Sequence, residues 1–120
     1  MPRMKRVYYL STCDTCKRIM HQVSGLDAWK QIDIKQDNIS ADDLDLIAEK
    51  SGGYEAVFSK RSRKYRAQNL HEQSLSEQDY RKLILEEYTF LKRPVWITED
   101  RVFVGNSKKV VADLLAYDGS

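Results

Sequence analysis

Both cysteines of the chain lie in one four-residue window, Cys13-Asp14-Thr15-Cys16. Thiols three residues apart on a helix lie one turn from each other, so the second can reach a bond formed on the first. A thiolate at Cys13 would be a nucleophile, and Cys16 would resolve a mixed disulfide or a sulfenic acid formed on it. The spacing therefore predicts a reversible redox pair, with Cys13 attacking and Cys16 resolving.

A C-x-x-C pair also occurs in structural zinc sites, which need four ligands. The only other residues of the soft type that zinc prefers are two histidines. His21 lies five residues beyond Cys16, and His71 lies in a polar stretch far along the chain. A further ordinary role of cysteine is that of a small buried hydrophobic residue. We favour the redox pair over both roles, and we expect no metal and no bound cofactor.

The segments around the cysteines are expected to place them at the amino end of a helix. Arg6 to Ser11 is β-branched and aromatic and predicts a strand, Thr15 to Val23 has apolar residues at helical spacing, and Trp29 to Ile34 predicts a second strand. The partial positive charge at the amino end of a helix stabilises a thiolate, and Lys17 and Arg18 add positive charge nearby.

The remaining segments complete an α/β pattern. Gly25 is expected to end the first helix in a left-handed conformation, and two further helices are predicted after Ser40 and after Ser76, with a basic loop, SKRSRKYRAQ, before the second of these. The last third predicts two strands and a helix: Pro94 to Thr98, Arg101 to Val104, and a helix capped by Asn106-Ser107. The order β-α-β-α-α-β-β-α predicts a thioredoxin-like fold with a helical insert, in a single domain over residues 1–120.

Composition narrows the function classes. The 20 Lys and Arg residues nearly balance 18 Asp and Glu residues, and no predicted helix has the pattern of a DNA reader, so we expect no direct DNA binding. No apolar run approaches the length of a membrane span, and the amino-terminal segment lacks the apolar core of a signal peptide. We therefore expect a cytoplasmic protein without membrane contact, in which any Cys13–Cys16 bridge is transient and chemical.

Two basic features are candidates for binding an anion. Arg93 offers a planar fork of donors to an oxyanion, and Pro94 beside it enters a predicted strand, where its peptide bond is either an ordinary trans bond or a cis bond in a special turn. The basic run from Lys60 to Arg66 is either a solvated face, a source of one arginine for an anionic substrate, or a strip that docks an acidic partner.

The assembled motifs resemble the arsenate reductase family that is related to the Spx regulators, a branch of the thioredoxin-like superfamily. The resemblance runs from Val7 to about Leu115 and rests on three stretches: YYLSTCDTCKR, VFSKRSRKYRAQNL and FLKRPVWITEDRVFVGNSKKVV. It implies a thioredoxin-like fold with a helical insert, Cys13 as the nucleophile, and Arg61 together with Arg93 before a cis Pro94 as the anion-binding residues.

The sequence departs from this family pattern at two positions. Glutathione-linked arsenate reductases of this type generally have a single catalytic cysteine and a third arginine after the glycine that follows the last strand. Here Cys16 is present and Asn106 follows Gly105. The C-x-x-C pair resembles the Spx branch, whose members use it as a redox switch and bind the carboxy-terminal domain of the RNA polymerase alpha subunit.

The resemblance thus implies two alternatives from different classes. The first is an arsenate reductase-like thiol oxidoreductase that acts on a small oxyanion or a disulfide, with electrons from thioredoxin or from glutathione and glutaredoxin. The second is an Spx-like redox-sensing transcription regulator that binds the RNA polymerase alpha subunit. We favour the enzyme.

Overall fold

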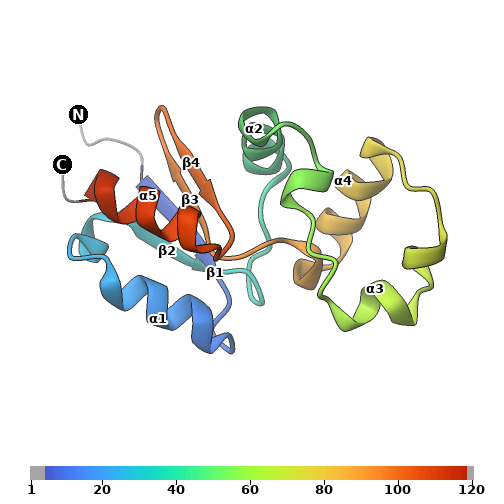
Figure 1. The fold of residues 1–120 in the computed structure, drawn as a ribbon, viewed down its shortest axis with the longest axis horizontal. Coiled ribbons are helices and arrows are strands. Elements are labelled where there is room, and N and C mark those ends of the chain that lie inside the picture. The colour runs from blue at the N-terminus through green and yellow to red at the C-terminus, as the bar shows by residue number, and fades with distance from the viewer. Residues whose placement is uncertain (1–4, 119–120) are drawn as a thin grey trace. The chain divides into compact units, whose positions relative to one another are not determined.

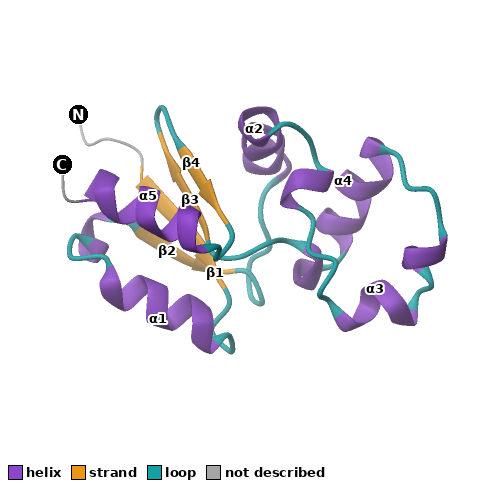
Figure 2. Ribbon diagram, in the orientation of Figure 1, coloured by secondary structure: helices purple, strands orange, loops and turns teal. Residues whose placement is uncertain are grey.

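The structure is a computed structural model that describes residues 5–118. Contacts group these residues into two compact units: the first comprises the described residues up to Asp37 together with those from Arg93 onward, and the second is Asn38–Lys92. All strands of the described residues belong to the first unit, and the second is built of helices and loops (Figure 2). The single domain expected over residues 1–120 stays a prediction.

A four-stranded sheet in the order β2-β1-β3-β4 forms the centre of the first unit (Figure 1). β1 (Lys5–Tyr9) pairs in parallel with β2 (Lys30–Asp33), and the two strands are joined by α1 (Asp14–Gln22). β3 (Val95–Thr98) is antiparallel to β1 and to β4 (Val102–Val104). The predicted β-α-β and β-β-α parts are confirmed, and together with the intervening helices they make the thioredoxin-like fold.

One face of this sheet carries a buried row that crosses three strands. Val7 lies opposite Trp96, and Trp96 lies opposite Phe103. α1 and α5 (Lys108–Asp118), which can be followed in Figure 1, pack on this row. The two helices and the cap residue after α1 add four buried side chains: Ile19, Met20, Val23 and Leu114. Full burial of an apolar side chain of this size contributes about 1.5–3 kcal/mol, so this cluster anchors both helices to the sheet.

The glycine after α1 is not left-handed, so that prediction is wrong. The helix ends at Gln22 with Val23 as its carboxy-terminal cap, and Gly25 has a φ of −93°. The carboxylate of Asp118, at the end of α5, accepts hydrogen bonds from the Ser24 amide at 3.0 Å, the Ser24 hydroxyl at 2.9 Å and the Gly25 amide at 3.3 Å. A Cβ at position 25 would lie 3.1 Å from an Asp118 oxygen, so glycine serves the close approach of this carboxylate.

Two longer helices of the second unit begin at the predicted caps. The Ser40 hydroxyl accepts from the Asp43 amide at the start of α2 (Ala41–Ser51), and Ser76 forms a capping box with Asp79 at the start of α4 (Glu77–Glu86). α2 ends at Gly52, whose φ of 96° lies in the left-handed region that glycine adopts without steric cost. The described residues contain no helix long and apolar enough to cross a membrane.

The segment predicted as a basic loop contains a short helix, α3 (Arg63–Ala67). The Ser62 hydroxyl accepts from the Lys64 amide and so caps the first turn. The run of basic residues by itself does not predict this capped helix. The ring of Tyr65 packs edge-on against Phe58 at 5.8 Å, and Phe58 also stacks on Phe90 at 5.0 Å. Aromatic contacts therefore hold this basic helix to the core of the second unit.

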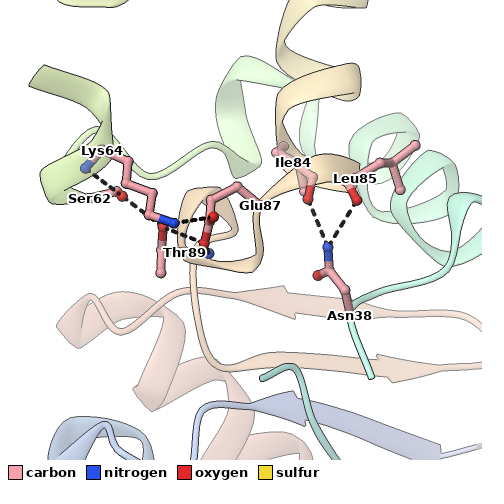
Figure 3. A network of polar contacts seen from close by, with 7 residues as sticks. All are labelled: Asn38, Ser62, Lys64, Ile84, Leu85, Glu87 and Thr89. Atoms are coloured by element: carbon pink, nitrogen blue, oxygen red, sulfur yellow. Dashed lines mark hydrogen bonds and ion pairs between the residues drawn. The ribbon is translucent and has the colours of Figure 1, made fainter. Parts of the chain in front are cut away.

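Polar contacts add to that core (Figure 3). The Asn38 amide donates to the carbonyls of Ile84 at 2.9 Å and Leu85 at 3.4 Å, which satisfies carbonyls in the last turn of α4. The hydroxyls of Ser62 and Thr89 lie 2.8 Å apart, so the start of α3 is tied to the turn that precedes Phe90.

Candidate active site

Cys13 is the amino-terminal cap of α1. The chain leaves β1 through a turn in which the Cys13 amide donates to the Leu10 carbonyl at 3.0 Å. The Cys13 backbone is extended, with φ −99° and ψ 108°, and its sulfur accepts from the Cys16 amide at 3.5 Å. The sulfur thus occupies the place of a capping oxygen, where the partial positive charge of the helix end favours a thiolate. This position is the predicted one; the catalytic role stays a prediction.

The surroundings of Cys13 favour its ionised form. Partial burial opposes ionisation, but hydrogen bonds from the Cys16 amide and the Cys16 thiol, together with the hydrogen bond and positive charge of Arg93, outweigh it and lower the pKa of Cys13. Lys17 and Arg18 are exposed on α1, and their effect on this thiol stays a prediction. A thiol with a lowered pKa and partial exposure is the kind that reacts as a nucleophile.

Cys16 has the opposite character. Its side chain is fully buried, and this burial, together with the neighbouring Cys13 charge, raises the pKa of Cys16 to about 12 against a backbone hydrogen bond with Leu10 that opposes the rise. Both cysteines are free thiols in the structure. The pair therefore combines a thiolate-prone sulfur at the surface with a protonated sulfur beneath it, one turn along the same helix.

The peptide bond between Arg93 and Pro94 is cis, as the family resemblance implied. Pro94 is buried and immediately precedes β3, and its carbonyl accepts from the Gly105 amide at 2.9 Å. Gly105 has a φ of 93°, which favours glycine, and it is followed by the exposed, uncharged Asn106. A backbone hydrogen bond therefore holds the segment after β4 against the segment that carries Arg93. The residue that follows Gly105 adds no positive charge beside that arginine.

Asp33, which the sequence patterns do not single out, contacts the turn that precedes Cys13. It ends β2 opposite Tyr9, and its Oδ1 accepts from the Ser11 amide at 3.3 Å and from the Lys35 amide at 3.1 Å. Slight burial opposes ionisation, but hydrogen bonds from Ser11 and Lys35 outweigh it and lower the pKa of Asp33. The available signal was its place at the end of a predicted strand, because parallel neighbours end at the same edge of a sheet.

Arg61, the other predicted anion-binding residue, is exposed and belongs to the second unit, so its part in the site stays a prediction. Two of its basic neighbours are paired within that unit. The Lys60 ammonium lies 2.8 Å from the Glu55 carboxylate, and Lys64 forms an ion pair with Glu87. The basic run is therefore partly neutralised.

The described part of the chain contains no group of three His, Cys, Asp or Glu side chains that could hold a metal ion. His21 is exposed on α1, and the Nε2 atom of His71 lies 3.7 Å from a Glu72 carboxylate oxygen. Neither histidine forms a candidate metal site with the two cysteines.

Comparison with known proteins gives matches along nearly the whole chain. A family model described as the ArsC family matches residues 8–114. The global transcriptional regulator Spx 2 of Bacillus anthracis is 25% identical over 118 residues, which covers 91% of this chain and 85% of the regulator.

Solved structures show the same fold. A putative ArsC family related protein from Bacteroides fragilis has a TM-score of 0.80 at 19% identity, covering 95% of this chain and 99% of that chain. A possible arsenate reductase from Streptococcus mutans has a TM-score of 0.72 at 25% identity, covering 93% of this chain and 98% of that one.

Proposed function

Because this chain belongs to the ArsC family, we propose that it is an arsenate reductase-like thiol oxidoreductase, with Cys13 as the nucleophile and Cys16 as the resolving thiol. The observation that carries the proposal is the difference between the two thiols. Cys13 is partly exposed with a lowered pKa, whereas Cys16 is buried with a raised pKa. An attacking thiol must be ionised and accessible, and a resolving thiol must be held near it without competing for substrate.

With arsenate as the substrate, two steps balance the chemistry. The Cys13 thiolate attacks arsenic and displaces one oxygen, which leaves as water after protonation, so a sulfur–arsenic bond forms. Cys16 then loses its proton and attacks the Cys13 sulfur. The sulfur–arsenic bond breaks, its electron pair stays on arsenic, and arsenite leaves. The two electrons that reduce As(V) to As(III) come from the two thiols, which end as the Cys13–Cys16 disulfide.

A disulfide substrate would follow a parallel route. The Cys13 thiolate attacks one sulfur and releases the other as a thiolate, and Cys16 then releases the bound half as a second thiol. Arg93 fits both routes, because its charge stabilises the attacking thiolate and its planar donors suit an oxyanion. Arg61 would add a second positive charge for an oxyanion, and Pro94 would line the substrate position beside Arg93.

The resulting disulfide needs an external reductant before the next cycle. Thioredoxin, or glutathione with glutaredoxin, would supply two electrons by thiol–disulfide exchange at Cys13, which is the partly exposed sulfur. No bound cofactor is needed for this cycle, and a cytoplasmic location would keep these reductants available.

A redox-sensing transcription regulator is the second candidate function. It is favoured by the similarity to the regulator from Bacillus anthracis and by the presence of a second cysteine, Cys16. In this alternative, oxidation of the same pair changes the affinity of the chain for the RNA polymerase alpha subunit. The chemistry at Cys13 is the same, but its consequence is a change in binding to the alpha subunit and not the turnover of a substrate.

Arsenate-dependent NADPH oxidation by the purified protein tests the enzyme. The assay is coupled in parallel to the thioredoxin system and to glutathione with glutaredoxin, with Cys13→Ser and Cys16→Ser as variants. We expect turnover that Cys13→Ser abolishes. If Cys16→Ser stays active, an external thiol and not Cys16 resolves the intermediate on Cys13. No turnover in either system, together with tighter binding of the oxidised protein to the purified alpha subunit domain, would replace the enzyme with the regulator.

A further inference from the structure

The turn between β1 and Cys13 is fastened to the neighbouring strand by one side chain. Its closing bond runs from the Cys13 amide to the Leu10 carbonyl, which leaves the Ser11 amide pointing out of the turn without a partner in the turn itself. Asp33 Oδ1 accepts from that amide at 3.3 Å, and the Ser11 hydroxyl also helps to lower the pKa of the Asp33 carboxyl. The backbone and the side chain of one turn residue therefore both act on this carboxylate.

Asp33 is itself held in place from three sides. It pairs with Tyr9 in the sheet register, and the Ile34 amide donates to the Tyr9 carbonyl at 2.9 Å. Its Oδ1 also accepts from the Lys35 amide at 3.1 Å, which fixes the side chain over its own turn. The carboxylate is therefore a fixed point on β2 from which the position of Ser11, two residues before Cys13, is set.

We propose that Asp33 is a positioning residue for the reactive thiol, acting through Ser11 to hold Cys13 at the amino end of α1. The inference rests on the proposed function for its biological use, but it concerns the state of the Cys13 sulfur alone. The cap contact from the Cys16 amide to the Cys13 sulfur is long, at 3.5 Å, so a small displacement of the turn weakens it. The same displacement moves the sulfur relative to Arg93.

The sign of the effect separates positioning from simple electrostatics. A carboxylate that acted on Cys13 only by its negative charge would disfavour the thiolate, and its removal would lower the Cys13 pKa. A carboxylate that positions the turn favours the thiolate, and its removal raises that pKa. Asparagine keeps an oxygen that can accept from Ser11 but has no charge, whereas alanine removes the acceptor altogether.

The experiment measures the alkylation rate of Cys13 against pH in the full-length reduced protein with iodoacetamide, with the modified residue identified by mass spectrometry. In Asp33→Ala we expect the Cys13 pKa to rise by roughly 0.5–1 pH unit, the effect of losing about one hydrogen bond. At a pH below the pKa, the alkylation rate then falls roughly three- to tenfold. Asp33→Asn should leave the pKa close to its original value, as should Asp27→Asn, an exposed aspartate of the same unit.

A fall of the pKa in both Asp33 variants would overturn the proposal in favour of a charge effect. An unchanged pKa in Asp33→Ala, with a lower melting temperature, would reduce Asp33 to a structural role and also overturn it. If Asp33→Ala does not fold, Ser11→Ala removes the hydroxyl and keeps the amide that bonds to Asp33, and a smaller rise of the Cys13 pKa is expected; no rise contradicts the proposal. Alkylation needs no turnover, so failure of the reductase assay leaves this result unaffected.

Discussion

Replacing Arg93 with glutamine should raise the Cys13 pKa and slow every reaction of the thiol near neutral pH. Arg93 acts on Cys13 through a hydrogen bond and through its positive charge, and both effects favour the thiolate. Glutamine keeps a donor of similar reach but has no charge. The substitution therefore removes mainly the Coulomb attraction.

The size of the effect follows from the two charges and from the exposure of the pair. At about 4 Å, two unit charges attract by about 1 kcal/mol in bulk water and about 4 kcal/mol near a protein surface. Cys13 and Arg93 are both only partly buried, so solvent screening places the interaction in the lower half of that range, at about 1–2 kcal/mol. The corresponding rise in the Cys13 pKa is roughly 0.7–1.5 pH units.

Ultraviolet absorbance of the thiolate, recorded against pH and corrected with Cys13→Ser, measures this pKa. The titration of Cys16, at about 12, lies well above that of Cys13 and does not obscure it. Arg93→Lys should give a smaller rise because the charge is kept, and Arg101→Gln, in the turn between β3 and β4, serves as the matched control for loss of an exposed arginine of the same unit. A Cys13 pKa that falls or stays the same in Arg93→Gln would refute the reasoning.

Three further predictions concern other residues of the chain. In the reduced protein, the raised pKa of Cys16 contributes stability that is present below the thiol's unfolded pKa and is lost as pH rises toward 12. Between roughly pH 9 and 11, the free energy of unfolding measured in urea should therefore fall with pH more steeply in the original protein than in Cys16→Ala. The difference in slope is at most about 1.4 kcal/mol per pH unit, and parallel curves would contradict this prediction. Asn106→Arg adds a positive charge after Gly105, which is bonded to Pro94, and should raise kcat/KM for arsenate roughly tenfold in the coupled assay, whereas Asn106→Gln should not. Ser76→Ala removes the capping box of α4 and should lower the free energy of unfolding by about 1 kcal/mol in urea titrations; an unchanged midpoint would show that the cap is dispensable.

Local patterns determined most of the secondary structure. The capping serines, the apolar spacing of the helices and the β-branched strands depend on neighbours within a few residues, so Ser40, Ser76 and the hairpin after Pro94 were predicted correctly. The exceptions are instructive. The Gly25 amide donates to the carboxylate of Asp118, 93 positions along the chain, so its conformation depends on a distant residue. The helix α3 depends on a cap at Ser62 and on contact with the ring of Phe58, and a pattern of charges along the sequence indicates neither.

The sequence by itself determined which sulfurs are close enough along the chain to exchange a bond, because three residues on a helix make one turn wherever the helix lies. Only the tertiary structure decided how the two differ. The lowered pKa of Cys13 depends on Arg93, whereas the raised pKa of Cys16 depends on the core that buries its thiol. The contact of Asp33 with Ser11 joins positions 22 residues apart, and it exists because β1 and β2 pair in parallel and end at the same edge. Charge and burial act through space, so they are settled only once the chain has folded.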